Sequence, residues 1–149
     1  GLMRAARFAI GLSVLCLAAC NLNLFATPPV EYVAVTTVTG DRGALHARAG
    51  VYYTLANVDS RQIVSLQIAF DLYDAESQPV PGQGANSFYT DVEASLASGA
   101  TVQFATSLDE VFAAVPESLS VARFRVASAR FEDGATWTNT GGYVYEAAE

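Results

Sequence analysis

The chain has 149 residues, of which 52% are hydrophobic and 15% are charged, and its formal net charge at pH 7 is −7. This length is enough for one domain with its own core, and the composition excludes disorder along most of the chain. All eight basic residues are arginines. An acidic body of this kind is repelled by the phosphates of nucleic acids, so we expect no nucleic-acid partner.

The first 19 residues have the composition of an export signal. Two arginines precede an uncharged apolar run of 12 residues that extends from Phe8 to Ala19. The run is too short for the roughly 20 residues of a membrane-spanning helix, but it has the length of a signal-peptide core. We therefore predict a helical signal peptide over residues 1–19. Cys16 lies inside this segment and would be removed with it.

The end of the run, Leu17-Ala18-Ala19-Cys20, resembles the lipobox of bacterial lipoproteins. The resemblance implies that the chain is cut before Cys20 and that the Cys20 thiol carries a diacylglycerol, which anchors the protein in a membrane of the bacterial cell envelope. By the same resemblance, Asn21 permits transfer to the outer membrane, on the periplasmic side, if the cell is Gram-negative. The alternative is an ordinary signal that ends in two alanines, with Cys20 incidental. In either case the mature chain keeps one cysteine and forms no disulfide.

From Val30 onward the dominant hydrophobic period is two, which indicates strands with one buried face. In residues 64–72, every even position is apolar. Similar alternation occurs in residues 45–56, 101–105 and 121–132, and a first strand is expected at about residues 30–38. The last of these stretches changes phase near Ala127-Ser128, which predicts a β-bulge.

One segment departs from the strand pattern. Its apolar residues have helical spacing, Ser107 and Glu110 form a capping box, and Pro116 limits its end. We therefore predict a short helix over residues 108–115 that crosses between two sheets.

For residues 30–146 we predict an all-β fold, an immunoglobulin-like antiparallel β-sandwich of about seven strands with one crossover helix, and a small barrel is the alternative. Residues 20–29 end in two prolines and are predicted to be a tether between the signal peptide and this domain. Asp133-Gly134 is typical of a two-residue hairpin turn.

Residues 70–74, with the sequence FDLYD, resemble the motif of the FxLYD domain family of bacterial and archaeal extracytoplasmic proteins. Asn57 ends the preceding strand, as in the family pattern. The later part of the pattern is matched by Leu96, Gly99 and Phe104, with Ser98 where proline is usual. The similarity extends over about residues 44–138. It implies an immunoglobulin-like sandwich in the cell envelope and little about activity.

The motif is also explained by strand geometry. Phe70 and Leu72 belong to the inward-facing set of their strand, and Asp71 lies on the opposite face. Asp74 ends the strand, where its carboxylate can accept hydrogen bonds from the amides of the following loop.

The sequence contains no convincing catalytic, cofactor or metal site, and we expect no enzyme activity. His46 is the only histidine, and we expect it on the exposed, polar side of a strand without a nucleophile elbow nearby. Asp71, Asp74 and Glu76 could supply oxygen ligands, but they lack the glycine and the terminal glutamate of a calcium loop. The glycines at 82–84 do not open a helix, so no phosphate loop is expected.

One basic cluster stands out in the acidic body. Arg123 and Arg125 are expected to project from the last hairpin with Trp137 near them. Arginine and amphipathic aromatic residues concentrate in contact surfaces, so these three residues are a candidate binding surface. The alternative is that the arginines pair with acids such as Glu132 and that Trp137 fills the core.

The sequence therefore predicts a lipid-anchored cell-envelope protein whose sandwich domain is non-catalytic and serves protein interaction or structural support. Its expected partners are the membrane, through the lipid on Cys20, and an unidentified envelope protein. The alternative is a ligand-binding module that takes a glycan or a small anion on the arginine–tryptophan surface. A hydrolase, the third class, would need His46 as its base.

Overall fold

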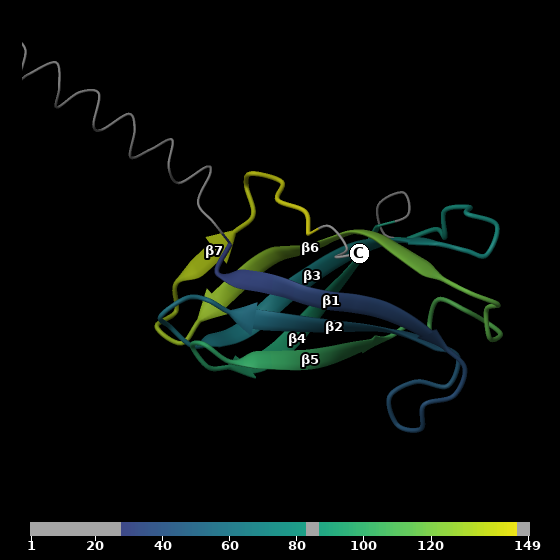
Figure 1. Ribbon diagram of the computed structural model, residues 1–149, viewed down its shortest axis with the longest axis horizontal. Helices are drawn as coiled ribbons and strands as arrows, with labels where there is room; N and C mark the ends of the chain where they lie inside the picture. The colour runs from purple at the N-terminus through teal and green to yellow at the C-terminus, as the bar shows by residue number, and fades with distance from the viewer. Residues whose placement is uncertain (1–27, 83–86, 146–149) are drawn as a thin grey trace, which may run out of the picture. The chain divides into compact units, whose positions relative to one another are not determined.

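The computed structural model describes residues 28–82 and 87–145, and this part of the chain forms seven strands in two antiparallel sheets. The sheet orders are β1-β2-β5 and β4-β3-β6-β7, and Figure 1 shows the two sheets as layers of a sandwich. The strands are β1 (Val30–Thr39), β2 (Ala49–Asn57), β3 (Ile63–Tyr73), β4 (Ser87–Leu96), β5 (Thr101–Ser107), β6 (Ser120–Phe131) and β7 (Thr136–Thr138). The predicted all-β sandwich of about seven strands is confirmed. The barrel alternative is wrong, because the sheets remain separate.

The core lies between the sheets and follows the alternation seen in the sequence. In β3 the inward-facing side chains of Leu66, Ile68, Phe70 and Leu72 are all buried. They share one hydrophobic cluster with the buried residues of β2. Each fully buried side chain of this size stabilises the fold by about 1.5–3 kcal/mol relative to an exposed one.

Aromatic side chains join the two sheets at the centre of the core. The ring centroids of Tyr53 in β2 and Phe124 in β6 are 5.3 Å apart, and Tyr32 in β1 lies 5.9 Å from Phe124. Such pairs contribute about 0.5–1.5 kcal/mol each beyond the burial of their area. Residues 28–149 contain no cysteine, so aromatic packing and not a disulfide joins β2 to β6.

Three register shifts interrupt the pairing of β6 with β3, and two of them are bulges in β6. Ala127 has no partner in β3, because Ser128 pairs with Gln67 and Val126 with Ile68, which confirms the predicted bulge. The second bulge includes Arg123, whose φ of 52° is in the left-handed region. A non-glycine residue with this backbone has no recognisable sequence signal.

The prediction of a helix over residues 108–115 is wrong. The segment makes a single turn, in which the Val111 N–H donates to the Leu108 carbonyl at 2.9 Å, and the described residues contain no helix. The Asp109 carboxylate explains the difference, because it accepts hydrogen bonds from the backbone N–H groups of residues 47–49. This contact fixes the turn to the loop before β2. A longer helix would bury little, since Val115 is 56% exposed.

In the part of the chain that the structure describes, no helix has the length and apolar character needed to cross a membrane.

The expectation that His46 is exposed is also wrong. β2 begins only at Ala49, and His46 lies in the preceding loop with 3% exposure. Its Nδ1 is 3.0 Å from the Gly40 carbonyl oxygen, and its Nε2 is 2.8 Å from the Tyr52 hydroxyl. The imidazole packs directly on Gly50, where an added Cβ would lie 2.4 Å from the ring. The missing side chain of Gly50 therefore makes the space in which the histidine is buried.

Asn57 fixes three segments at the other end of the sandwich. Its Nδ2 donates to the carbonyl oxygens of Arg61 at 2.8 Å and Leu96 at 2.9 Å. Its Oδ1 accepts a hydrogen bond from the Asp59 N–H at 2.9 Å. The side chain is 1% exposed, so these bonds replace all of its contacts with water. One asparagine thereby holds the end of β2, the β2–β3 loop and the end of β4 together.

Replacing this asparagine should destabilise the domain strongly. We expect Asn57→Ala to lower the free energy of unfolding by about 2–4 kcal/mol, because it leaves buried carbonyl and amide groups without partners. Urea unfolding followed by circular dichroism measures the change. The matched control is Gln103→Ala on the exposed side of β5, which should change stability by less than about 0.5 kcal/mol. Similar losses for both variants would contradict this role of Asn57.

The Asp109 contact should make stability depend on pH. Hydrogen bonds from residues 47–49 hold the pKa of the Asp109 carboxyl below its usual value of 3.8. The folded-state pKa is thus lower than the unfolded one, so the stabilisation is present above pH 3.8 and is lost as the pH falls through the folded-state pKa. Asp109→Asn should therefore lower Tm at neutral pH and reduce the further fall in Tm on acidification. The control is the exposed neighbouring residue, because Glu110→Gln should leave the decrease in Tm on acidification as large as in the unmodified protein. If Asp109→Asn also showed the full decrease in Tm, the stabilising role of the Asp109 carboxylate would be contradicted.

Candidate functional site

The predicted lipidation site, Cys20, and the predicted helical signal peptide over residues 1–19 lie outside the described residues. The described chain begins with Pro28 and Pro29, which are both buried, and the Pro29 carbonyl accepts a hydrogen bond from the Val58 N–H at 2.9 Å. The two prolines predicted to end the tether thus belong to the folded unit. Residues 20–27 remain between the cysteine and the sandwich.

Arg123 and Arg125 come together around Asp71, on the outer face of the four-stranded sheet. Nη1 of Arg123 lies 3.3 Å from Oδ2 of Asp71, and Nη1 of Arg125 lies 3.5 Å from Oδ1. The Ser87 hydroxyl donates to the same Oδ1 at 2.6 Å and accepts from Nη2 of Arg125 at 3.3 Å. We call these four residues the polar cluster. The acid that pairs with both arginines is therefore Asp71 and not Glu132.

The two arginines differ in how much of the guanidinium is engaged. The Arg125 side chain is 13% exposed, donates also to the Arg123 carbonyl at 2.7 Å, and lies over the Tyr89 ring. The Arg123 side chain is 62% exposed, whereas that of Asp71 is 3% exposed. Arg125 is thus the main structural partner of the buried carboxylate, and Arg123 retains N–H donors that face solvent.

The structure does not bring Trp137 to the two arginines. Trp137 pairs with Ala129, which pairs with Leu66, and both of these residues belong to the core. Directly paired residues lie on the same face of a sheet, so Trp137 points inward, where it is partly buried against the core. Arg125 pairs with Ala69, on the opposite face. The three residues therefore do not form one surface.

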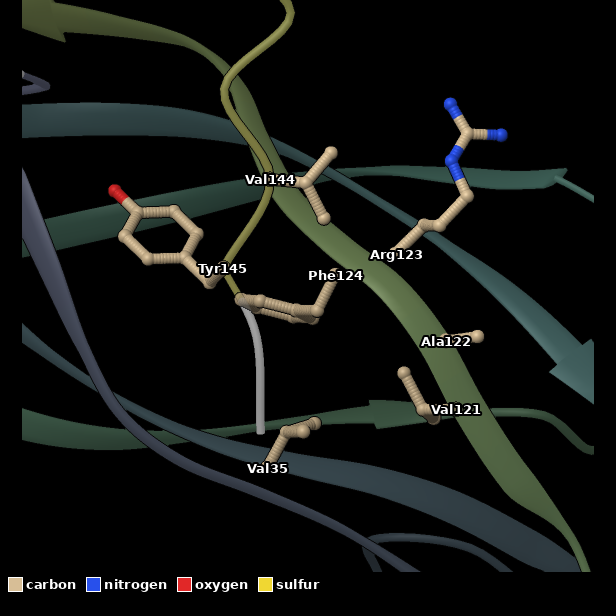
Figure 2. A pocket seen from close by; sticks show the side chains of 7 residues that line it. All are labelled: Val35, Val121, Ala122, Arg123, Phe124, Val144 and Tyr145. Carbon is tan, nitrogen blue, oxygen red and sulfur yellow. The ribbon is translucent and has the colours of Figure 1, made fainter. Parts of the chain in front are cut away.

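A groove of about 240 Å³ lies beside the first part of β6 (Figure 2). In Figure 2, Val35 of β1 points toward Val121 of β6, and the guanidinium of Arg123 points away from both. The groove is therefore apolar, with one cationic residue at its rim. Its lining consists of Val35, Val121, Ala122, Arg123, Phe124, Val144 and Tyr145.

Tyr145 closes one end of this groove. Its N–H donates to the Phe124 carbonyl at 2.8 Å and forms an isolated antiparallel bridge with that residue. Its hydroxyl donates to the Val30 carbonyl, and burial raises the pKa of that hydroxyl. From Arg123 back to Ser120, no described residue pairs with this side of β6. No local sequence pattern indicates this groove, because its walls come from segments far apart in the chain.

Two of the three acidic residues considered as calcium ligands, Asp71 and Asp74, accept other hydrogen bonds. Asp74 Oδ1 accepts hydrogen bonds from the N–H groups of Glu76 and Gln78 at 2.9 Å, which confirms its predicted role in the turn. Among residues 28–82 and 87–145, no group of histidine, cysteine, aspartate and glutamate side chains is arranged to hold a metal ion. Most of the glycine segment 82–84 lies outside the described residues.

The chain matches no protein-family model, no curated protein and no solved structure. The functional argument therefore depends on sequence pattern and geometry.

The two arginines should differ in their effect on stability. Arg125→Met leaves the buried Asp71 with the Ser87 hydroxyl and one exposed guanidinium as partners, so we expect a loss of about 2–3 kcal/mol. Arg123→Met removes an exposed pair and should cost at most about 1 kcal/mol. Chemical denaturation of both variants gives the comparison. Equal losses would show that Asp71 does not depend mainly on Arg125.

Proposed function

We propose that this protein is a lipid-anchored protein of the bacterial cell envelope whose β-sandwich domain binds another envelope protein without catalysis. The export signal and the lipobox-like end at Cys20 support the anchor. A polar cluster whose buried carboxylate is paired within the domain and a groove at an open sheet edge support a binding role rather than a chemical one.

We propose further that the sandwich is immunoglobulin-like. β1, β2 and β5 have the order of strands A, B and E, and β3, β6 and β7 have the order of C, F and G. The chain changes sheet between β2 and β3, between β4 and β5 and between β5 and β6, as Greek-key sandwiches do. β4 pairs with β3, whereas the fourth strand of a constant-type domain pairs with strand E.

The resemblance to the FxLYD family supports the same assignment, because its motif residues have structural roles in this fold. Asn57, which ends the strand before the motif, accepts a hydrogen bond on its backbone carbonyl from the Gly99 N–H at 2.8 Å. Ser98, at the position where proline is usual, donates to the Asp59 carbonyl at 2.6 Å. Residues 70–72 of the motif are buried. These contacts and the burial of residues 70–72 support a structural role for the family pattern.

The main observation that supports the proposal is the short stretch of chain between Cys20 and the sandwich. Residues 20–27 can span at most about 28 Å when fully extended. A diacylated cysteine would therefore hold the domain next to the membrane surface. Neighbouring envelope proteins are then at a high effective concentration, so a weak contact is enough for function.

The tether also gives the domain an orientation. Val30 pairs with Asn57 and Thr39 pairs with Ala49, so β1 begins at the end of the sandwich that carries Asn57. The loops that join β1 to β2, β3 to β4 and β5 to β6 lie at the opposite end (Figure 1). These loops would face away from the anchoring membrane.

The described residues favour neither alternative class. His46 is buried with both ring nitrogens occupied, which removes it as an accessible base for a hydrolase. A module for a glycan or a small anion would have to use the arginines without Trp137, because the tryptophan lies on the other face of the sheet.

Fatty-acid labelling tests the anchor. When the full chain is expressed in bacteria that are fed an alkyne-tagged fatty acid, we expect the protein to take up the label. Cys20→Ser should abolish the label, because the acceptor thiol is gone. Cys16→Ser is the matched control and should retain the label, since that residue leaves with the signal peptide. Label on Cys20→Ser, or none on the unmodified chain, would contradict the proposal.

A further inference from the structure

We propose that the groove beside β6 is the docking site for an extended segment of a partner protein, which pairs with the open edge of β6 and places an acidic side chain on Arg123. This inference deepens the proposed function and rests on it, because it names the surface and the chemistry of the partner.

The first observation is the open backbone edge. β6 pairs with β7 only at residues 128–130 and with Tyr145 only at Phe124. Along residues 120–123, no described residue pairs with this side of β6, although the opposite side pairs with β3. An unpaired edge offers N–H and C=O groups to an added strand. Tyr145 already bonds to this edge in antiparallel geometry, so an added segment would continue an existing pairing.

The second observation is the apolar wall of the groove. Val35 and Val121 face each other across it, and Phe124 and Tyr145 close it at one end. Side chains of an added strand would alternate between this apolar wall and the outer face of the sheet. The segment should therefore alternate apolar residues with residues that face Arg123.

The third observation is the charge at the rim. The Arg123 side chain is 62% exposed, and among the described residues its guanidinium donates one hydrogen bond, of 3.3 Å, to Asp71. Asp71 is also paired with Arg125, so its single negative charge cannot neutralise both guanidinium groups. Charge-assisted bonds from arginine to carboxylate are among the stronger hydrogen bonds in proteins. The exposed guanidinium of Arg123 therefore favours a partner segment with an acidic side chain at this position.

The edge along residues 120–123 is short, so the interaction should be weak in solution. Weak affinity is consistent with a domain held on a membrane, where the effective concentration of a neighbouring protein is high.

Two synthetic peptides test the proposal on the full chain in detergent micelles. Acetyl-Val-Glu-Val-Glu-Val-amide is compared with acetyl-Val-Lys-Val-Lys-Val-amide, and binding is followed by the NMR amide shifts of the labelled protein. We expect the glutamate peptide to bind about tenfold more tightly. The shifts should be concentrated at residues 120–124 and at Tyr145.

Three variants test separately how the charge at the rim and the shape of the groove contribute to peptide binding. Arg123→Gln should abolish the preference for the glutamate peptide, so that both peptides bind about equally, because it removes the charge at the rim. Arg42→Gln, in the exposed loop between β1 and β2, is the matched control and should keep the preference. Val35→Trp should weaken both peptides by filling the groove. Thermal melts show which variants keep the fold.

Several results would overturn the proposal. These are equal binding of both peptides, no binding of either, or shifts centred on β5 instead of β6. Binding seen only after the chain is shortened to end at Tyr145 would show that the chain itself occupies the groove, and it would equally overturn docking of a partner. The assay does not depend on lipid, so its failure is distinguishable from failure of the fatty-acid label at Cys20.

Discussion

The buried carboxylate of Asp71 is the interaction on which the four-stranded sheet depends. β3 is covered on both faces, and residues 68–72 are all buried. A carboxylate at such a position is costly unless it is paired and hydrogen-bonded. Ser87 from β4 and Arg125 from β6 supply those bonds, so one charge ties together the three neighbouring strands. The bulge at Arg123 brings a second guanidinium to it and leaves that group largely exposed at the groove.

Much of the sandwich could be predicted from sequence, because burial of one face gives each strand a period of two. The bulge at Ala127 was visible for the same reason, since an extra residue shifts that period. The helix over residues 108–115 could not be excluded, because apolar spacing does not reveal that the Asp109 carboxylate bonds to backbone groups 60–62 residues earlier in the chain. The burial of His46 likewise depends on the space above Gly50, which a pattern of polar and apolar residues does not record.

The candidate site was predicted only in part. The two arginines were recognised as a cluster, but Asp71 lies 52 residues before Arg123 and was not identified as the shared partner. Trp137 is close to them in sequence, yet strand pairing turns it to the other face of the sheet. The groove could not be predicted, because Val35, Val121 and Val144 meet only after the strands pair. Local sequence thus indicated which side chains carry charge, and long-range pairing decides what each one contacts.

The proposed membrane attachment would give these features a common purpose, because a short tether would make a small, weakly binding edge useful. The proposed attachment requires the single sulfur atom of Cys20, and intact-protein mass spectrometry of the mature protein tests it most directly. The account predicts a chain that begins at Cys20 and carries the added mass of a diacylglycerol on that residue. A mature chain with a free Cys20 thiol, or one cut at another position, would contradict it.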